Sequence, residues 1–282
     1  MKTKLLFLGA ALFLCSCAGI NVKQPEISTV KKIAILSVTS NEEYLDIKVQ
    51  KGEKETLLRG IGNVIKDNVE FITEDQVNVV TYGANQLFKT LSEIQGWTVV
   101  PFETVTQSAD VEAFYKETKV DGESVNLGGI KLKEKQDIRR VAPQGMRVLP
   151  FNKVIPNGST WVNGERIEAP ILRGMGKLCE ILGVDAIAVA EYSFAYETGM
   201  MTQVTNNVTP IVAVNVVLVD KNGNKILYTD TGWDQFESED SAKLRNGYVS
   251  LNDGGRSINA YKKGIDASMA GFKEKAAKKL GK

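Results

Sequence analysis

The spacing of apolar and polar residues along the chain predicts several buried strands. Residues 31–38 (KKIAILSV) form an apolar run between lysines and a polar segment, which is typical of a buried strand. The runs 184–197 (VDAIAVAEYSFAYE) and 211–219 (IVAVNVVLV) have the same character. Asn222-Gly223 separates the latter run from residues 225–233 (KILYTDTGW), and this dipeptide between two β-rich runs indicates a tight hairpin.

The clearest helix signal lies at residues 76–96, where apolar residues recur every three or four positions. Asp75 precedes this stretch as a candidate cap, and Gly96 is expected to end it. The next run, 97–105 (WTVVPFETV), predicts a strand that leads into a polar turn. The residues that form the apolar face of the helix are Val80, Ala84, Leu87, Leu91 and Ile94.

Three further helices are predicted. Residues 108–119 have Ser108 as a candidate cap, and residues 169–183 end at Gly183, where helices commonly stop. Residues 257–280 form a long amphipathic helix with lysines in its last turn. The apolar side of that helix carries Tyr261, Ile265, Met269, Phe272, Ala276 and Leu280.

Residues 119–168 differ in character, because Gly, Pro and turn dipeptides recur there, and they indicate a β-rich excursion from the main domain. A small hairpin is predicted around Asn163-Gly164. The order of elements is strand, helix, strand, helix, excursion, helix, strand, hairpin and helix. This order predicts an α/β (α+β) fold in which helices pack on a mixed sheet. Nothing separates two cores, so residues 31–282 are expected to form a single domain.

The amino-terminal segment has the layout of a secretory signal peptide. Lys2 and Lys4 precede an almost purely apolar run at residues 5–14. Such a run extends roughly 15 Å as a helix, which is about half the thickness of a bilayer core. We therefore expect a targeting segment and not a membrane span.

Residues 14–17 (LCSC) resemble the lipobox of bacterial lipoproteins. That motif has an aliphatic residue at −3 and a small residue at −1 before the cysteine that receives the lipid. Cys17 fits, with Leu14 and Ser16 at these positions. Cys15 does not fit, because Leu14 at its −1 position is too large.

The lipobox resemblance implies that residues 1–16 leave as the signal peptide and that Cys17 is lipidated. Residues 17–30 would then form the lipid anchor and a short polar tether before the first strand. Ala18 stands where an inner-membrane retention signal would commonly show Asp, which favours the outer membrane. The alternative is an ordinary signal peptide cut nearby, with Cys17 left as a free thiol.

The amino-acid composition excludes several classes of binding and catalysis. The chain has 35 basic and 34 acidic residues, so it lacks the basic excess of a nucleic-acid binder. It contains no histidine, which excludes Ser-His-Asp and Cys-His catalysis and zinc sites built on imidazole. Cys179 lies in an apolar helical stretch and is expected to pack as a small hydrophobe. We expect no catalytic residue, metal or cofactor.

Four segments together resemble the periplasmic domain of curli-secretion (CsgG-like) lipoproteins. The same outline recurs in lipoprotein activators of peptidoglycan synthases and in the amino-terminal domain of Tol-associated proteins. The resemblance implies an α/β sandwich, a periplasmic location, and a binding or assembly role without catalytic residues. The segments are KKIAILSV (31–38), GWTVVPFETV (96–105), LGVDAIAVAEYSFAYE (182–197) and VNVVLVDKNGNKIL (214–227).

The resulting hypothesis is a non-catalytic outer-membrane lipoprotein, and it has two alternatives. Curli-type channel subunits insert two long hairpins into the membrane, and residues 197–210 and 123–155 occupy the equivalent places. The first stretch is polar and too short for two spanning strands, and apolar and polar residues alternate poorly in the second. These features oppose pore formation, and a channel subunit is therefore kept as the first alternative and not as the main hypothesis. An enzyme acting on envelope polymers is the second. The expected partners are the membrane, through the lipid on Cys17, and envelope proteins or further copies of the chain, but not nucleic acid.

The lipid assignment predicts opposite outcomes for the two amino-terminal cysteines. Cys17→Ser should block lipidation and leave the chain uncleaved or soluble, whereas Cys15→Ser should leave processing intact. Each buried methylene contributes about 0.8 kcal/mol, so two or three acyl chains hold firmly where one does not. Labelling with radioactive palmitate and partition into detergent measure the result. A Cys17→Ser chain that still behaves as a processed lipoprotein would contradict the assignment.

Overall fold

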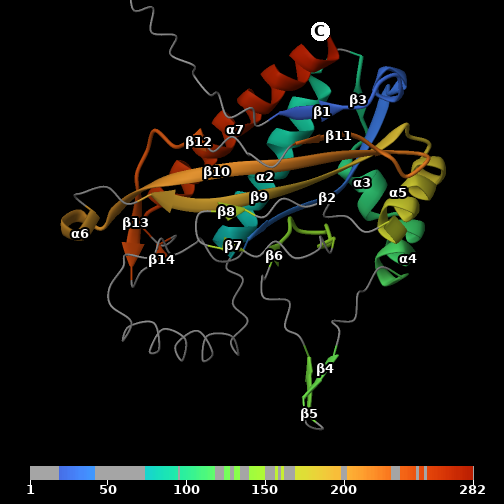
Figure 1. The fold of residues 1–282 in the computed structure, drawn as a ribbon. Coiled ribbons are helices and arrows are strands. Elements are labelled where there is room, and N and C mark those ends of the chain that lie inside the picture. Colours follow the sequence, from blue (N-terminus) through green and yellow to red (C-terminus); the bar gives the residue numbers. More distant parts are fainter. Residues whose placement is uncertain are drawn as a thin grey trace, which may run out of the picture.

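The computed structural model describes residues 19–41, 74–94, 96–117, 124–127, 130–133, 140–149, 156–157, 160–161, 169–197, 202–229, 236–245, 248–250 and 253–281. The predictions for the signal peptide, Cys17 and Asn163-Gly164 lie outside these residues. Within them the chain forms a mixed sheet with helices packed on it, which confirms the predicted α/β class (Figure 1).

Three long strands form the middle of the main sheet: β2 (Lys32–Asn41), β9 (Ala186–Glu197) and β10 (Asn207–Asp220). β2 runs parallel to β9, and β9 runs antiparallel to β10. The strand order is β1-β11-β10-β9-β2-β3, in which the outer strands are β1 (Ile20–Val22), β11 (Lys225–Thr229) and β3 (Thr98–Val99).

Short strands complete the β-structure. Four of them pair along the margins of the main sheet, and the other four form two separate hairpins, β4–β5 and β7–β8, within the predicted excursion. Their bounds are β4 (Ser124–Leu127), β5 (Ile130–Lys133), β6 (Arg140–Val141), β7 (Pro156–Asn157), β8 (Thr160–Trp161), β12 (Phe236–Glu237), β13 (Ala242–Arg245) and β14 (Tyr248–Val249).

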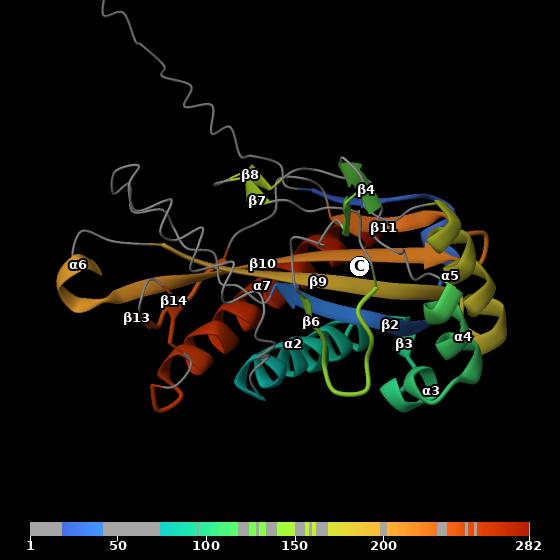
Figure 2. The same ribbon diagram turned by 90° about the horizontal axis from the view of Figure 1, so that it is seen from below.

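Two long helices, α2 (Glu74–Ser92) and α7 (Arg256–Leu280), lie side by side on one face of the sheet (Figure 2). α3 (Phe102–Thr106), α4 (Ala109–Glu117) and α5 (Ala169–Leu182) gather at the end where β10 turns into β11. The short helix η1 (Glu26–Thr29) follows β1, and α6 (Thr202–Thr205) lies at the tip of the β9–β10 hairpin.

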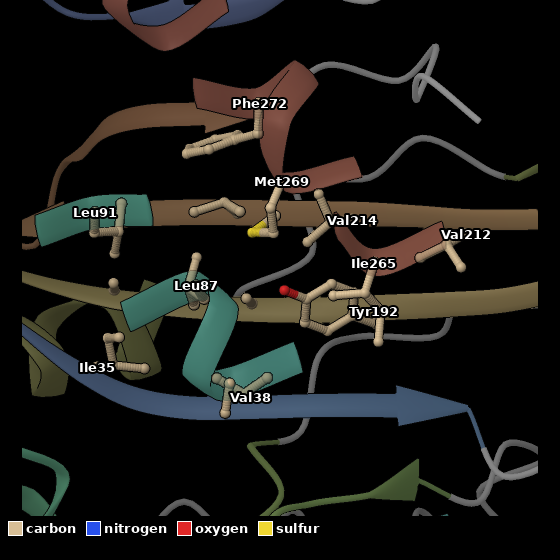
Figure 3. Close-up of a cluster of buried hydrophobic side chains, with 14 of the residues drawn as sticks. Ile35, Val38, Leu87, Leu91, Tyr192, Val212, Val214, Ile265, Met269 and Phe272 are labelled. Atoms are coloured by element: carbon tan, nitrogen blue, oxygen red, sulfur yellow. The ribbon is translucent and has the colours of Figure 1, made fainter. Parts of the chain in front are cut away.

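The larger core lies between the sheet and the pair α2 and α7 (Figure 3). Tyr192 of β9 is fully buried there, and its hydroxyl donates to the carbonyl of Gly83 at 2.9 Å. A Cβ atom at Gly83 would lie 2.7 Å from the Tyr192 ring, so glycine is what lets α2 approach β9 this closely. Figure 3 also shows Leu87 and Leu91 of α2 and Ile265, Met269 and Phe272 of α7 in this core.

Polar contacts hold α2 and α7 together at their exposed edges. The Tyr82 hydroxyl of α2 donates to both carboxylate oxygens of Asp266 in α7, at 2.8 and 3.0 Å. Burial, and then the hydrogen bond to Asp266, raise the pKa of Tyr82 to about 12, so it stays protonated at neutral pH. Lys273 of α7 pairs with Glu93, just beyond α2, at 2.7 Å.

A smaller core lies on the opposite face of the sheet, under α5. Val189 and Val217 are direct partners in the β9–β10 register and both belong to this core. A Cβ atom at Gly176 of α5 would lie 2.7 Å from the backbone nitrogen of Gly223, so α5 rests directly on the β10–β11 turn. The α5 side chains in this core are Ile171, Met175, Leu178 and Cys179.

Most predicted elements are confirmed, including the tight hairpin between β10 and β11. The backbone N–H of Val111 donates to Ser108 Oγ at 3.4 Å, so Ser108 caps α4 as predicted. Gly183 ends α5 with a φ of +62°, a conformation that glycine adopts at little cost. The apolar side predicted for α7 is buried from Tyr261 to Ala276.

The strand predicted at residues 97–105 is wrong beyond Val99. Pro101 has φ −56° and lacks the N–H that a ladder requires, and α3 begins at the next residue. The helix turns Val105 into the smaller core and brings Phe102 against Phe88 of α2, with ring centroids 5.4 Å apart. The helical conformation lets both side chains pack at once, Phe102 against α2 and Val105 in the smaller core, which an edge strand would not allow.

Other boundaries also differ from the predictions. Asp75 lies inside α2 and does not precede it, and α2 ends at Ser92 and not at Gly96. β10 begins at Asn207, four residues before the predicted start, because its first residues pair with both β9 and β13. β8 pairs with β7, and the predicted hairpin around Asn163-Gly164 lies outside the described residues.

The pairing of Val189 with Val217 predicts that a charge at this place unfolds the domain. Val217→Asp would bury a carboxylate without a compensating partner and should destabilise the domain by more than about 4 kcal/mol. Val204→Asp is the matched control, because Val204 of α6 is 75% exposed, and its effect should stay within about 0.5 kcal/mol. Thermal unfolding followed by circular dichroism measures both, and a Val217→Asp protein that melts within a few degrees of the parent would refute this placement.

Candidate functional site

The segment that follows the predicted lipidation site is folded onto the edge of the main sheet. β1 pairs antiparallel with β11, with Ile20 opposite Thr229, and the N–H of Lys23 donates to the carbonyl of Ile226 at 2.9 Å. Ile20 is 4% exposed and Ile27 is 1% exposed. The tether predicted before the first strand is therefore wrong for residues 20–30, because their apolar side chains are buried against the core.

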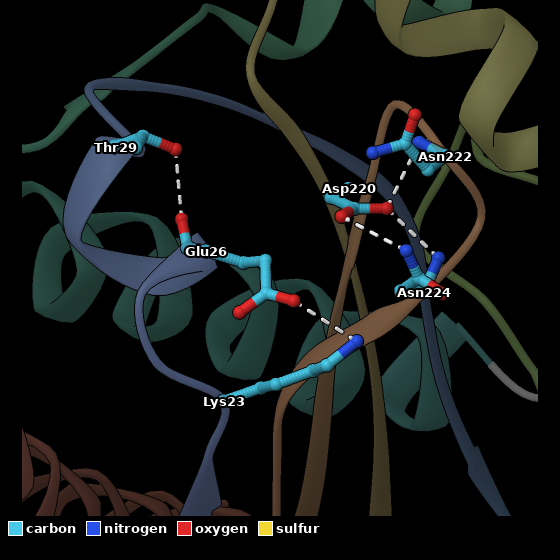
Figure 4. A network of polar contacts seen from close by, with 6 residues as sticks. All are labelled: Lys23, Glu26, Thr29, Asp220, Asn222 and Asn224. Carbon is cyan, nitrogen blue, oxygen red and sulfur yellow. Dashed lines mark hydrogen bonds and ion pairs between the residues drawn. The ribbon is translucent and has the colours of Figure 1, made fainter.

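A network of polar contacts fixes the turn after β1 (Figure 4). The Lys23 ammonium pairs with the Glu26 carboxylate at 3.0 Å, and the Thr29 hydroxyl donates to the Glu26 carbonyl at 2.8 Å. These contacts stabilise η1, which places Ile27 in the core. The chain between β1 and β2 is therefore fixed by strand pairing at both ends and by the buried Ile27 side chain in the middle.

The β10–β11 turn lies in the same view (Figure 4). The Asp220 carboxylate accepts the backbone N–H groups of Asn222 and Asn224 at 2.9 and 2.8 Å. This arrangement uses the carboxylate to close the turn, as the hairpin interpretation of this segment predicts. In the described part of the chain, no group of three or more His, Cys, Asp or Glu residues is placed to hold a metal ion.

The distance from the predicted lipid to the sheet is short. Cys17 precedes Ile20, the first residue of β1, by three positions. An extended chain spans at most about 3.6 Å per residue, so the two residues are separated by no more than about 11 Å. A lipid on Cys17 would therefore hold the β1 edge close to the bilayer surface. Among the described residues, no helix is long and apolar enough to cross a membrane.

A row of polar side chains crosses the middle of the sheet, on the face that α5 covers farther along. The strand registers place Thr39 of β2 opposite Glu191 of β9, and Glu191 opposite Asn215 of β10. Their exposures are 0%, 4% and 7%. Thr229 of β11 extends the row, since its hydroxyl donates to Asn215 Oδ1 at 2.6 Å.

The polar row is buried inside the fold: Asn215 accepts a hydrogen bond from Thr229, whereas the Thr39 hydroxyl has no hydrogen-bond partner among the described residues. Ser37 lies two positions before Thr39, and its hydroxyl donates to the carbonyl of Arg147 at 2.9 Å. Leu149, which is fully buried, donates its N–H back to Ser37 Oγ at 3.4 Å, so residues 147–149 close over this part of β2. At this burial the polar groups of the row on β2, β9 and β10 have little access to solvent.

Sequence reasoning missed this row, although a signal was present. Glu191 and Asn215 interrupt two otherwise apolar runs, and each stands two residues from a core valine, Val189 or Val217. Residues two apart on a strand share a face, so the interruptions are on one side of the sheet. Their alignment with each other depends on strand register, which the sequence pattern does not specify.

Cys179 packs as the small hydrophobe that was predicted. It is fully buried, and its Sγ donates to the carbonyl of Val219 at 3.7 Å. Burial, and then the negative charge of Asp220, raise the pKa of the thiol to about 12. The thiolate is the reactive form of cysteine, so this environment opposes a nucleophilic role.

Comparison with known proteins identifies no family for this chain. No family model and no curated protein matches the chain. The solved structure of a hypothetical protein from Chlamydia trachomatis matches with a TM-score of 0.33 and 12% sequence identity, covering 86% of this chain and 96% of that one. A TM-score of this size does not establish a shared fold.

The environment of Cys179 predicts a thiol that is silent in the folded protein. A Cys15→Ser/Cys17→Ser variant keeps Cys179 as its single thiol. With a pKa near 12 and no exposed surface, this thiol should not react with Ellman's reagent at pH 8 in buffer. One equivalent should react in denaturant. Rapid reaction of the native protein would show that α5 does not pack on the sheet as described.

Proposed function

We propose that the chain is a lipoprotein of the outer membrane, held by a lipid on Cys17, whose α/β domain acts in the periplasm by binding or assembly and not by catalysis. One observation carries the proposal: β1 is locked into the sheet three residues after the cysteine that the lipobox resemblance selects. Cleavage before Cys17 would leave only Ala18 and Gly19 between the lipid and the first paired residue.

A binding role is supported by how the domain uses its ionisable groups. The chain has no histidine, and the thiol of Cys179 is buried with a raised pKa. Several carboxylates join elements together: Glu112 accepts from the Arg147 guanidinium at 2.6 Å, and Asp240 pairs with Lys263 at 2.8 Å. These carboxylates are engaged in ion pairs at the surface, which is consistent with a structural use of charge.

The resemblance to curli-secretion lipoproteins and to activators of peptidoglycan synthases supports an assembly role, with envelope proteins or further copies of this chain as partners. The structure of residues 197–210 favours a scaffold over a channel subunit. Glu197 ends β9, α6 occupies the tip, and the residues from Asn207 onward belong to β10. The described part of this stretch is thus the end of a hairpin in the domain's own sheet.

Membrane fractionation tests the proposed location. In a host with two membranes, the wild-type lipoprotein should sediment with outer-membrane markers on a sucrose gradient. Ala18→Asp should shift it to the inner-membrane fraction, because Asp after the anchor cysteine resembles an inner-membrane retention signal. Ala18→Ser is the matched control and should stay in the outer membrane. Wild-type protein in the inner membrane or the soluble fraction would contradict the proposal.

The oligomer mass in detergent separates a scaffold from a channel. A scaffold should purify as a monomer or a small oligomer and should give no conductance in planar bilayers. A ring-shaped oligomer with discrete, reproducible conductance steps would replace the scaffold proposal with the channel subunit. Hydrolysis of purified peptidoglycan by the protein would instead favour the envelope enzyme.

A further inference from the structure

We infer that the carboxyl-terminal end of α7 makes a second, electrostatic contact with the membrane, and that anionic phospholipid headgroups are its partner. The inference rests on the proposed function, because it needs the lipid on Cys17 to bring the domain to the bilayer. It adds the surface of the domain that faces the membrane and the chemistry that this surface binds.

The position of α7 is the first observation. α7 packs against β1, and Figure 1 shows its carboxyl-terminal end next to that strand. Val22 of β1 and Leu280 of α7 pack against the same core. Since Cys17 lies no more than about 11 Å from Ile20, its lipid would bring the β1 edge and the end of α7 to the bilayer together.

The charge of this end is the second observation. Residues 275–281 contain three lysines and no acidic residue, and Lys278 and Lys279 are exposed. Glu274, just before them, is the exposed carboxylate of this part of α7. Glu93 of the neighbouring chain segment is engaged by Lys273 at 2.7 Å and so offsets little of the charge of Lys278 and Lys279.

The helix dipole gives a simpler reason for lysines in a last turn, because cations there are stabilised by the exposed carbonyl groups. The helix dipole explains why the charge is positive, but it does not explain why the lysines lie beside β1, the strand that follows the predicted lipid. The two explanations differ in what happens at a membrane. A lysine that only complements the dipole stays accessible to solvent, whereas a lysine bound to headgroups is protected.

The attraction between these lysines and anionic headgroups is large enough to orient the domain but too small to attach it to the membrane. The Debye length at physiological salt is about 8 Å, so exposed lysines beside the anchor edge lie within reach of the surface field of the membrane. Each lysine near an anionic surface shifts a binding equilibrium by about fivefold. The acyl chains already hold the protein, so Lys278 and Lys279 would set which side of the domain faces the bilayer.

Lysine footprinting tests the contact with the full lipoprotein. The protein is reconstituted in vesicles that contain phosphatidylglycerol and, in parallel, in vesicles of phosphatidylcholine alone. Brief acetylation followed by mass spectrometry gives the modification rate of each lysine. Lys278 and Lys279 should react about fivefold more slowly on the anionic vesicles. About 1 M salt, where the Debye length is about 3 Å, should remove the difference.

Lys177 of α5, which packs on the opposite face of the sheet, is an exposed control whose rate should be the same on both vesicles. Lys278→Glu should abolish most of the protection of Lys279, and Lys177→Glu should leave it intact. Equal rates for Lys278 and Lys279 on both vesicles, in protein that floats with them, would overturn the contact and leave the anchor standing. Protein that does not float with either vesicle would instead refute the proposed function.

Discussion

The antiparallel pairing of β9 with β10 carries the rest of the structure. It runs from Ala186 opposite Asp220 to Glu197 opposite Thr209, and every other layer attaches to one of these two strands. β2 joins β9 on one side, and β11 joins β10 on the other. Both helical layers pack on them, so the strands are buried on both faces near Val189 and Val217 and consist of nearly continuous apolar residues there.

The same pairing positions the proposed membrane-facing side. β10 provides the edge on which β11 forms, and β11 provides the edge on which β1 forms. A residue close to the predicted lipid is therefore held by residues some two hundred positions away in the chain. Because α7 packs on β10 as well as on β1, its lysine-bearing end is carried to the same side. The packing of α7 on β1 and β10 thus places the ends of these elements on one side of the domain.

The fold also shows how polar residues enter the middle of a sheet. Thr39, Glu191 and Asn215 align across three strands, next to the residues of the smaller core that pack under α5. The hydroxyl of Thr229 compensates part of the cost of burying Asn215. Ser37, two positions before Thr39, exchanges hydrogen bonds with residues 147 and 149. This face of the sheet is thus covered by α5 at one end and by residues 147–149 at the other, and the polar row lies between them.

Local patterns in the sequence determined the elements whose burial repeats along the chain. The spacing of apolar residues predicts β2, β9, β10 and the apolar side of α7, and the Asn-Gly dipeptide predicts the turn at Asn222-Gly223. Tertiary structure decided the rest. β1 has a three-residue pattern that becomes a strand only because β11 offers it an edge. Residues 102–106 form α3 because Phe102 packs against Phe88 and the larger core while Val105 enters the smaller core. The alignment of Thr39 with Glu191 and Asn215 is likewise a matter of register between distant strands. Such features depend on contacts between residues far apart in sequence, and periodicity within one segment carries no information about them.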